Sequence, residues 1–367
     1  MNTVQTPAWI PSFVVPFFTL SYPTDSPVYT DSFHDSVYYN TGLLDGCLII
    51  SWIAVMAILR DLTRIYVLEP FARWQLTRNW ERSRRSKTHA TGISNGVANG
   101  SSSAQNGHTH HSSEQDPPQS MTKKEARKIH RSVLRFAEQG WAAIYYFIQF
   151  SYGIYVYSQL PTRVLDPTDL WVNYPHIPLA GALKFYYLSQ IAFYLHQVFI
   201  LNAEARRKDH VQMMAHHVIT IILLVASYFY NYTRTGCLIL VLMDCCDIFL
   251  PIAKMLRYTG LYTLCDITFT WFLLLWFITR HVLFLIVIKS AWFDSVRLLR
   301  EIAWAPERGI YFSDLSHKAF VGLLVTLQII QIIWFWMICR VAWRVLTGHG
   351  ASDDRSDEEN SVDYKEQ

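Results

Sequence analysis

Long apolar stretches dominate the chain, and short polar blocks separate them. Each stretch is long enough to cross a hydrocarbon layer of about 30 Å, because a helix rises about 1.5 Å per residue. We therefore predict an all-α polytopic membrane protein, a bundle of about seven transmembrane helices with a polar interior. The predicted spans are residues 43–64, 141–160, 180–202, 211–230, 236–256, 263–289 and 319–343.

An eighth apolar segment, residues 8–20, is short and contains Pro11 and Pro16. This composition favours an interfacial segment over a further span. A basic region of the kind that precedes a cleavable signal peptide is missing, so the first span is expected to be an uncleaved anchor.

Basic residues near the spans predict the orientation of the chain. Residues 1–42 contain no Lys or Arg, whereas residues 65–140 contain twelve. Because loops rich in Lys and Arg stay in the cytosol, the N-terminus is predicted to be lumenal and the C-terminus cytosolic. The loop 290–318 is the weak point of this prediction, since it should be lumenal but carries four basic residues.

Five segments follow from these patterns. They are a lumenal segment (1–42), a first anchor (43–64), a basic and disordered cytosolic linker (65–124), a membrane domain (125–345) and an acidic cytosolic tail (346–367). Residues 86–121 within the linker are rich in Ser, Gly and Asn and cannot build a core. In the tail, Ser356 precedes Glu359 by three positions, which suits an acidophilic kinase.

Composition excludes several classes of function. The formal net charge of +3 is too small for a nucleic-acid-binding surface. All six cysteines lie in apolar stretches without metal-type spacing, so neither a disulfide framework nor a metal site is expected. The histidines at 108, 110 and 111 are attributed to low-complexity sequence. A di-iron lipid enzyme would need more histidine boxes than the chain contains.

Several predicted spans carry polar groups, each of which costs at least about 2–3 kcal/mol at the centre of a membrane. Span 211–230 holds His216 and His217. Span 236–256 holds Asp244 and Asp247, which share one helix face that continues through Lys254. Spans 180–202 and 263–289 add further polar groups at Gln190, Tyr194, Gln197 and Arg280. Adjacent helices are therefore expected to direct polar groups into one interior.

These residue types suggest acyl-transfer chemistry. A histidine oriented by a carboxylate can act as a general base or as an acyl-accepting nucleophile. His216 lies about 9 Å from the predicted cytosolic end of its helix, below a basic turn. The basic residues of this turn are Arg206, Arg207 and Lys208. They suit a reactant with an anionic head and an apolar tail, such as an acyl-CoA. Spacing alone leaves both a lipid enzyme and a transporter open, although no inverted repeat is visible.

The same residues resemble the Lag motif of ceramide synthases, which belong to the TRAM–Lag1–CLN8 membrane family. The resemblance covers about residues 125–345, and the Ser/Asn-rich linker resembles that of fungal members. The matching positions are Arg206, Arg207, Lys208, Asp209, Met213, His216, His217, Thr220, Ser227, Tyr228, Gly236, Met243, Asp244, Asp247, Ala253 and Lys254.

The resemblance implies N-acylation of a sphingoid base by a fatty acyl-CoA in the endoplasmic reticulum, without a cofactor. It assigns catalysis to His216, His217, Asp244 and Asp247, and it implies that the loop 290–318 influences acyl length. The partners expected are acyl-CoA, sphingoid base and membrane lipid. A homo- or heterodimer and a small single-span regulatory subunit are further candidates. Substrate binding is assigned to Arg206, Arg207, Lys208, Gln190, Tyr194, Gln197, Thr220, Lys254 and Arg280.

Two mechanisms remain open at this point. In one, His216 forms an acyl-imidazole that the sphingoid amine then attacks; in the other, His216 is only a general base for direct transfer. A non-catalytic lipid sensor or translocon accessory of the same family is the alternative function.

Overall fold

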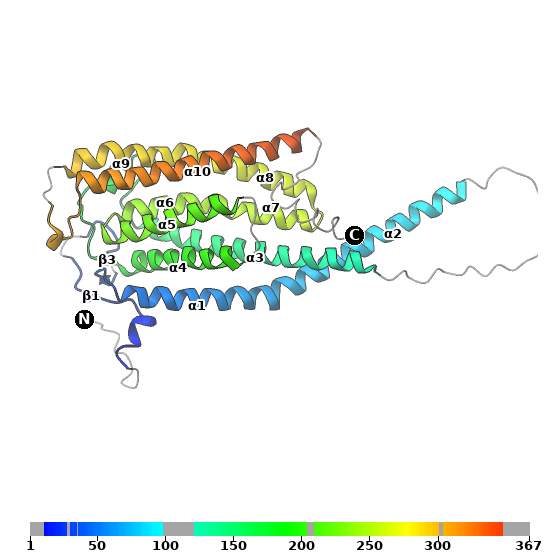
Figure 1. Ribbon diagram of the computed structural model, residues 1–367, viewed down its shortest axis with the longest axis horizontal. Helices are drawn as coiled ribbons and strands as arrows, with labels where there is room; N and C mark the ends of the chain where they lie inside the picture. The colour runs from blue at the N-terminus through cyan, green and yellow to red at the C-terminus, as the bar shows by residue number, and fades with distance from the viewer. Residues whose placement is uncertain are drawn as a thin grey trace, which may run out of the picture.

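A computed structural model describes residues 11–27, 30–34, 36–97, 121–203, 209–300 and 304–347. The helices run nearly parallel to the long axis of the molecule and form one bundle, from which the far part of α2 projects (Figure 1). The α-helices are α1 (Asp45–Thr63), α2 (Glu69–Val97), α3 (Lys123–Ser158), α4 (Gly181–Ala203), α5 (His210–Phe229), α6 (Thr233–Asp247), α7 (Phe249–Tyr258), α8 (Tyr262–Phe277), α9 (Phe284–Leu299) and α10 (Asp314–Leu346).

The two ends of the bundle differ. One end, here called the sheet end, carries the short antiparallel strands β1 (Pro23–Thr24), β2 (Tyr38–Tyr39) and β3 (Leu179–Ala180) in the order β1-β2-β3. The other end, here called the linker end, is where α2 leaves the bundle and where α3 begins (Figure 1). The start of α5 and the end of α10 also lie at the linker end.

Five helical segments are long and apolar enough to cross a membrane. The chain is therefore an all-α, multi-pass membrane protein, as predicted. Helices α3 and α4 cover the remaining two predicted spans, 141–160 and 180–202, but many Tyr, Gln and Ser side chains lower their hydropathy. Seven spans are thus not confirmed. The qualifying segments are Asp45–Ser86, His210–Phe229, Thr233–Tyr258, Tyr262–Leu299 and Asp314–Arg344.

Two predicted segments differ from expectation in detail. The described part of residues 8–20 contains only a short 3-10 helix, Val15–Phe17, which is too short to cross a membrane. Helix α2 continues to Val97 and so enters the segment 86–121 that composition assigned to a disordered linker. The extension adds turns to a helix that is already nucleated, and no proline interrupts it, although Gly92 and Gly96 have low helix propensity.

Two irregularities shape the interior. Helix α6 ends at Asp247 and α7 begins at Phe249. Pro251 explains this break, because its ring would clash with the carbonyl of Asp247 four residues earlier. Between α8 and α9 the chain forms a π-helical segment, Ile278–Leu283, which contains Arg280. Such π segments occur frequently at functional sites.

A buried ion pair holds the N-terminal segment on the sheet end. Lys184 on α4 is fully buried, and its Nζ lies 2.7 Å from Oδ1 of Asp45 on α1. The same ammonium group donates to the carbonyls of Ser21 and Asn40, and the hydroxyl of Tyr228 donates to Oδ2 of Asp45. These contacts connect the segment before α1 to α4 and α5.

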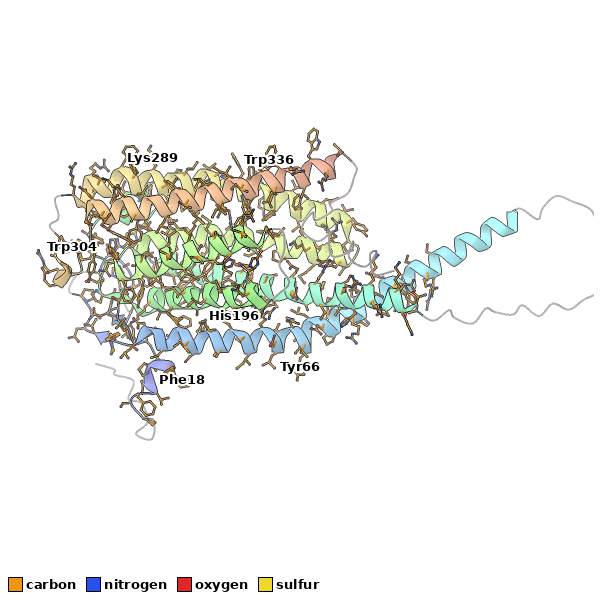
Figure 2. The ribbon with its side chains drawn as sticks, viewed as in Figure 1. Phe18, Tyr66, His196, Lys289, Trp304 and Trp336 are labelled. Carbon is orange, nitrogen blue, oxygen red and sulfur yellow. The ribbon has the colours of Figure 1, made fainter. Side chains whose placement is uncertain are left out.

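The outer surface of the bundle is aromatic and apolar. Phe18, Tyr66 and Trp336 lie on this surface, and each is more than half exposed (Figure 2). His196, in contrast, is buried on α4, in the region between α4 and α1 (Figure 2). The distribution fits a bundle that faces lipid and keeps its polar groups inside.

Candidate active site

The histidine pair lies on α5 and packs against side chains from α4 and α10. The rings of His216 and His217 have centroids 5.5 Å apart, and the ring of Tyr194 lies 6.5 Å and 5.9 Å from them. The ring of Trp334 packs 5.1 Å from that of His216. The two imidazoles are therefore held in fixed positions by aromatic contacts.

The tautomer of His217 follows from its hydrogen bond. Its Nδ1 lies 2.7 Å from the carbonyl oxygen of Met213, and a carbonyl can only accept. We therefore assign the proton of the neutral ring to Nδ1, which leaves the lone pair of Nε2 available to accept a proton. Nε2 is thus the ring nitrogen of His217 that can accept a proton.

Asp244 lies on α6 and is fully buried. Its Oδ2 accepts a hydrogen bond of 2.6 Å from Nε2 of Gln190 on α4. Its Oδ1 has no hydrogen-bond partner among the residues that the structure describes. A buried carboxyl oxygen without a partner is costly, so this atom is available to a ligand or to a proton.

Asp247 is held by Arg280, whose guanidinium is almost completely buried. Nη2 of Arg280 lies 2.6 Å from Oδ1 of Asp247, and the guanidinium stacks on the ring of Trp276 at 4.1 Å. The remaining hydrogen bonds of Arg280 go to the carbonyl of Met243 (2.9 Å), Sγ of Cys246 (3.1 Å) and Oε1 of Gln331 (3.0 Å). The structure thus gives Arg280 a positioning role, and its assignment to substrate binding stays a prediction.

An apolar cavity of ≈ 80 Å³ starts at His216 and extends between α5, α6, α9 and α10 towards the sheet end. Along α10 its walls include residues from Leu327 to His317, a span of about 15 Å at 1.5 Å per residue. Trp171 and Phe312 line its far part. Apolar side chains form most of its wall, which suits a hydrocarbon chain better than a charged ligand.

The structure brings several of the predicted site residues together. Tyr194, His216 and Thr220 all line the cavity, while Gln190 and Asp244 form the pair described above. Gln197 is half-buried on α4, and Lys254 is half-buried on α7. Arg206, Arg207, Lys208 and Ser356 lie outside the described residues.

Sequence reasoning missed the contribution of α10. Gln331 binds Arg280, Gln328 binds His281 through an amide–imidazole hydrogen bond of 2.9 Å, and Trp334 packs on His216. The three side chains recur every three positions within the predicted span 319–343, which was the available signal. In the part of the chain that the structure describes, no three His, Cys, Asp or Glu side chains gather as a metal site would require.

Known proteins are similar to this chain in sequence. The model of the TLC domain family (TRAM, LAG1, CLN8) matches residues 135–340. The ceramide synthase FUM18 of Gibberella moniliformis is 36% identical over 261 residues, 64% of this chain and 61% of that protein. The sphingosine N-acyltransferase lag1 of Schizosaccharomyces pombe is 32% identical over 321 residues, 88% of this chain and 69% of that protein. The human ceramide synthase 5 is 32% identical over 258 residues, 70% of this chain and 59% of that protein.

The match therefore spans about three-fifths of the length of FUM18 and of the human relative, and more than two-thirds of the fission yeast protein. The match of the family model includes the helices that carry the histidine pair and the two aspartates, and also the π-helical segment with Arg280. The chain belongs to the TLC domain family.

Proposed function

We propose that the chain is a sphingosine N-acyltransferase, which transfers a fatty acyl group from acyl-CoA to the amine of a sphingoid base. The observation that carries this proposal is the position of His216 at one end of a long apolar cavity. An acyl chain fills such a cavity, and its thioester carbon then lies beside the imidazole. The names of the relatives support the same reaction.

The CoA moiety is placed at the linker end. The sequence immediately before α5 contains Arg206, Arg207 and Lys208, whose side chains are natural partners for the phosphates of CoA. The basic residues of the segment 65–140 support a cytosolic position for this end, where acyl-CoA is available. We propose the endoplasmic reticulum membrane as the location of the protein.

The proposed reaction has two steps. His216 attacks the thioester carbon, a C–N bond forms, the C–S bond breaks, and the CoA thiolate takes up the proton that the imidazole loses. Nε2 of His217 then takes a proton from the sphingoid amine, whose nitrogen forms a bond to the acyl carbon. The bond between that carbon and His216 breaks, and the imidazole of His216 regains its proton from His217. The products are ceramide and free CoA. The rival scheme is direct transfer with His216 as the base.

The two aspartates support these steps from α6. Arg280 fixes the carboxylate of Asp247 and keeps its charge inside the bundle. Gln190 orients Asp244, whose Oδ1 is buried without a hydrogen-bond partner among the described residues. Neither step needs a metal or another cofactor. A second copy of the chain and a small single-span subunit are the protein partners we propose.

The test is ceramide formation by membranes of cells that lack their own ceramide synthases. The membranes receive sphinganine and a series of acyl-CoAs, and mass spectrometry identifies the products. Wild type is compared with His216→Ala and with the matched control His196→Ala, which removes a buried histidine remote from the cavity. We expect ceramide from wild type and from the control, and none from His216→Ala.

Two other results would change the conclusion. Ceramide from His216→Ala would remove the proposed nucleophile but leave the enzyme. No ceramide from folded wild type, with a candidate subunit supplied, would favour the non-catalytic lipid-sensing function. Intact mass spectrometry after incubation with acyl-CoA alone separates the two mechanisms, because only covalent transfer leaves an acyl adduct that His216→Ala lacks.

A further inference from the structure

Threonine hydroxyls within helices usually donate to the carbonyl four residues earlier, which satisfies a group that would otherwise be buried without a partner. Four threonines of this bundle follow that rule, with hydrogen bonds of 2.7–2.9 Å. They are Thr268, Thr270, Thr279 and Thr326.

Thr220 departs from this rule. It lies within α5, its side chain is buried, and its Oγ1 has no hydrogen-bond partner among the described residues. The carbonyl of His216, four positions earlier, is the acceptor that the rule would supply. An unsatisfied buried hydroxyl costs about 1–3 kcal/mol, so its presence requires an explanation.

The position of Thr220 provides that explanation. Helical side chains tilt towards the N-terminus of their helix, so Thr220 covers the turn that carries His216. Both residues line the same cavity. An acyl chain that occupies the cavity with its carbonyl at His216 therefore contacts Thr220, whose buried Oγ1 turns towards that carbonyl on rotation about the Cα–Cβ bond.

Ser227 and Thr235, two further hydroxyl residues in the cavity wall, are not equivalent to Thr220. Oγ of Ser227 contacts the carbonyl of Leu224 and the hydroxyl of Tyr187 at 3.1 Å each. Thr235 also lacks a partner, but it lies in the first turn of α6, where the helix offers no carbonyl four residues earlier. Both threonines of the cavity wall lack a hydrogen-bond partner among the described residues, but only for Thr235 does the position in the helix account for it.

We propose that Thr220 donates a hydrogen bond to the acyl carbonyl oxygen and stabilises the oxyanion that forms there. This inference rests on the proposed acyl transfer. When a nucleophile attacks the thioester carbon, a C–N bond forms and the carbonyl π pair moves to oxygen. The hydroxyl of Thr220 donates to that oxyanion without transferring its proton. Collapse re-forms the C=O bond, and the C–S bond breaks. The same hydroxyl serves the intermediate that the sphingoid amine forms.

Two substitutions separate the hydroxyl from the shape of the side chain. Thr220→Val keeps the shape and removes the hydroxyl, whereas Thr220→Ser keeps the hydroxyl. Removing one oxyanion donor costs about 100-fold or more in kcat, so we expect a loss of that order in Thr220→Val with KM for acyl-CoA nearly unchanged. Thr220→Ser should retain most of the activity. The control Thr326→Val, at an exposed position of α10, should match wild type.

Thermal unfolding in detergent distinguishes a catalytic role of the Thr220 hydroxyl from a role in packing. Because valine removes an unsatisfied buried hydroxyl, Thr220→Val should have a Tm equal to or above that of wild type despite its lost activity. Normal kcat in Thr220→Val would overturn the inference, as would equal losses in the Val and Ser variants or a fall in Tm. An inactive wild type would instead refute the proposed function, and the inference with it.

Discussion

The guanidinium of Arg280 and the carboxylate of Asp247 form a 2.6 Å ion pair between the π-helical segment and the end of α6. The guanidinium is the more deeply buried partner, with 3% of its side chain exposed against 25% for Asp247. A buried cation of this kind is stable only with its acceptors in place. The pair therefore connects the position of a predicted catalytic carboxylate to the packing of α8, α9 and α10.

The first prediction concerns this pair. Arg280→Met should lower the free energy of unfolding by about 3 kcal/mol and abolish acyl transfer, because it leaves Asp247 without its partner. Asp247→Asn in the same chain should recover part of the stability but none of the activity. Thermal unfolding in detergent and ceramide formation measure the two effects. A wild-type Tm in Arg280→Met would contradict the prediction.

The sequence predicted the helical class and the residues of the interior, because hydropathy and costly intramembrane charges are local signals. His216, Tyr194 and Thr220 do meet at one cavity. The pairing of Gln190 with Asp244 was not predictable in this way, since it depends on how α4 and α6 pack. The break between α6 and α7 could have been predicted from Pro251 alone.

Other features required the three-dimensional structure. The π-helical segment around Arg280 has no sequence signal of its own, and it decides which partners the guanidinium reaches. The ion pair between Lys184 and Asp45 joins two predicted spans that lie far apart in the sequence. The cavity itself forms between α5, α6, α9 and α10, with Tyr194 of α4 also in its wall, so no single segment reveals it.

A second prediction concerns the hydrogen bond to Asp244. Gln190→Leu removes the donor to a fully buried carboxyl group, so we expect a loss of about 1–3 kcal/mol in stability and at least about tenfold in kcat. Gln149→Leu is the matched control, because Gln149 is a buried amide that donates to Ser189 instead. It should cost similar stability and leave kcat near wild type. Equal kcat in the two variants would show that Gln190 has no special role.

A third prediction concerns acyl length. Val321 lines the cavity on α10, towards the sheet end from Leu327, so Val321→Phe should block its far part. Membranes with this variant should lose activity towards the longest acyl-CoAs that wild type accepts and keep activity towards shorter ones. Val325→Phe adds the same volume on an exposed face of the same helix and should leave the chain-length profile unchanged. Identical profiles for Val321→Phe and wild type would place the acyl chain elsewhere.

A fourth prediction concerns the pH dependence of stability at the sheet end. Both carboxylate oxygens of Asp31 accept hydrogen bonds from Arg234, at 2.6 Å and 2.7 Å. Burial alone would raise the pKa of Asp31, but the hydrogen bonds and charge of Arg234 outweigh it, so the pKa lies below its ordinary value of 3.8. A carboxyl with a lowered pKa stabilises the fold fully above its unfolded pKa, and this stabilisation disappears as the pH falls through the folded value.

The measurement is Tm in detergent as a function of pH for wild type, Asp31→Asn and the control Asp25→Asn, which changes an exposed carboxylate of the same segment. The Tm of wild type should exceed that of Asp31→Asn by a constant amount from about pH 7 to pH 5. This difference in Tm should shrink between about pH 4 and pH 2. Asp25→Asn should follow wild type throughout. A difference that persists undiminished at the lowest pH would mean that Asp31 stabilises the fold through packing or neutral hydrogen bonds. Its charge would then have no part in holding the N-terminal segment against α6.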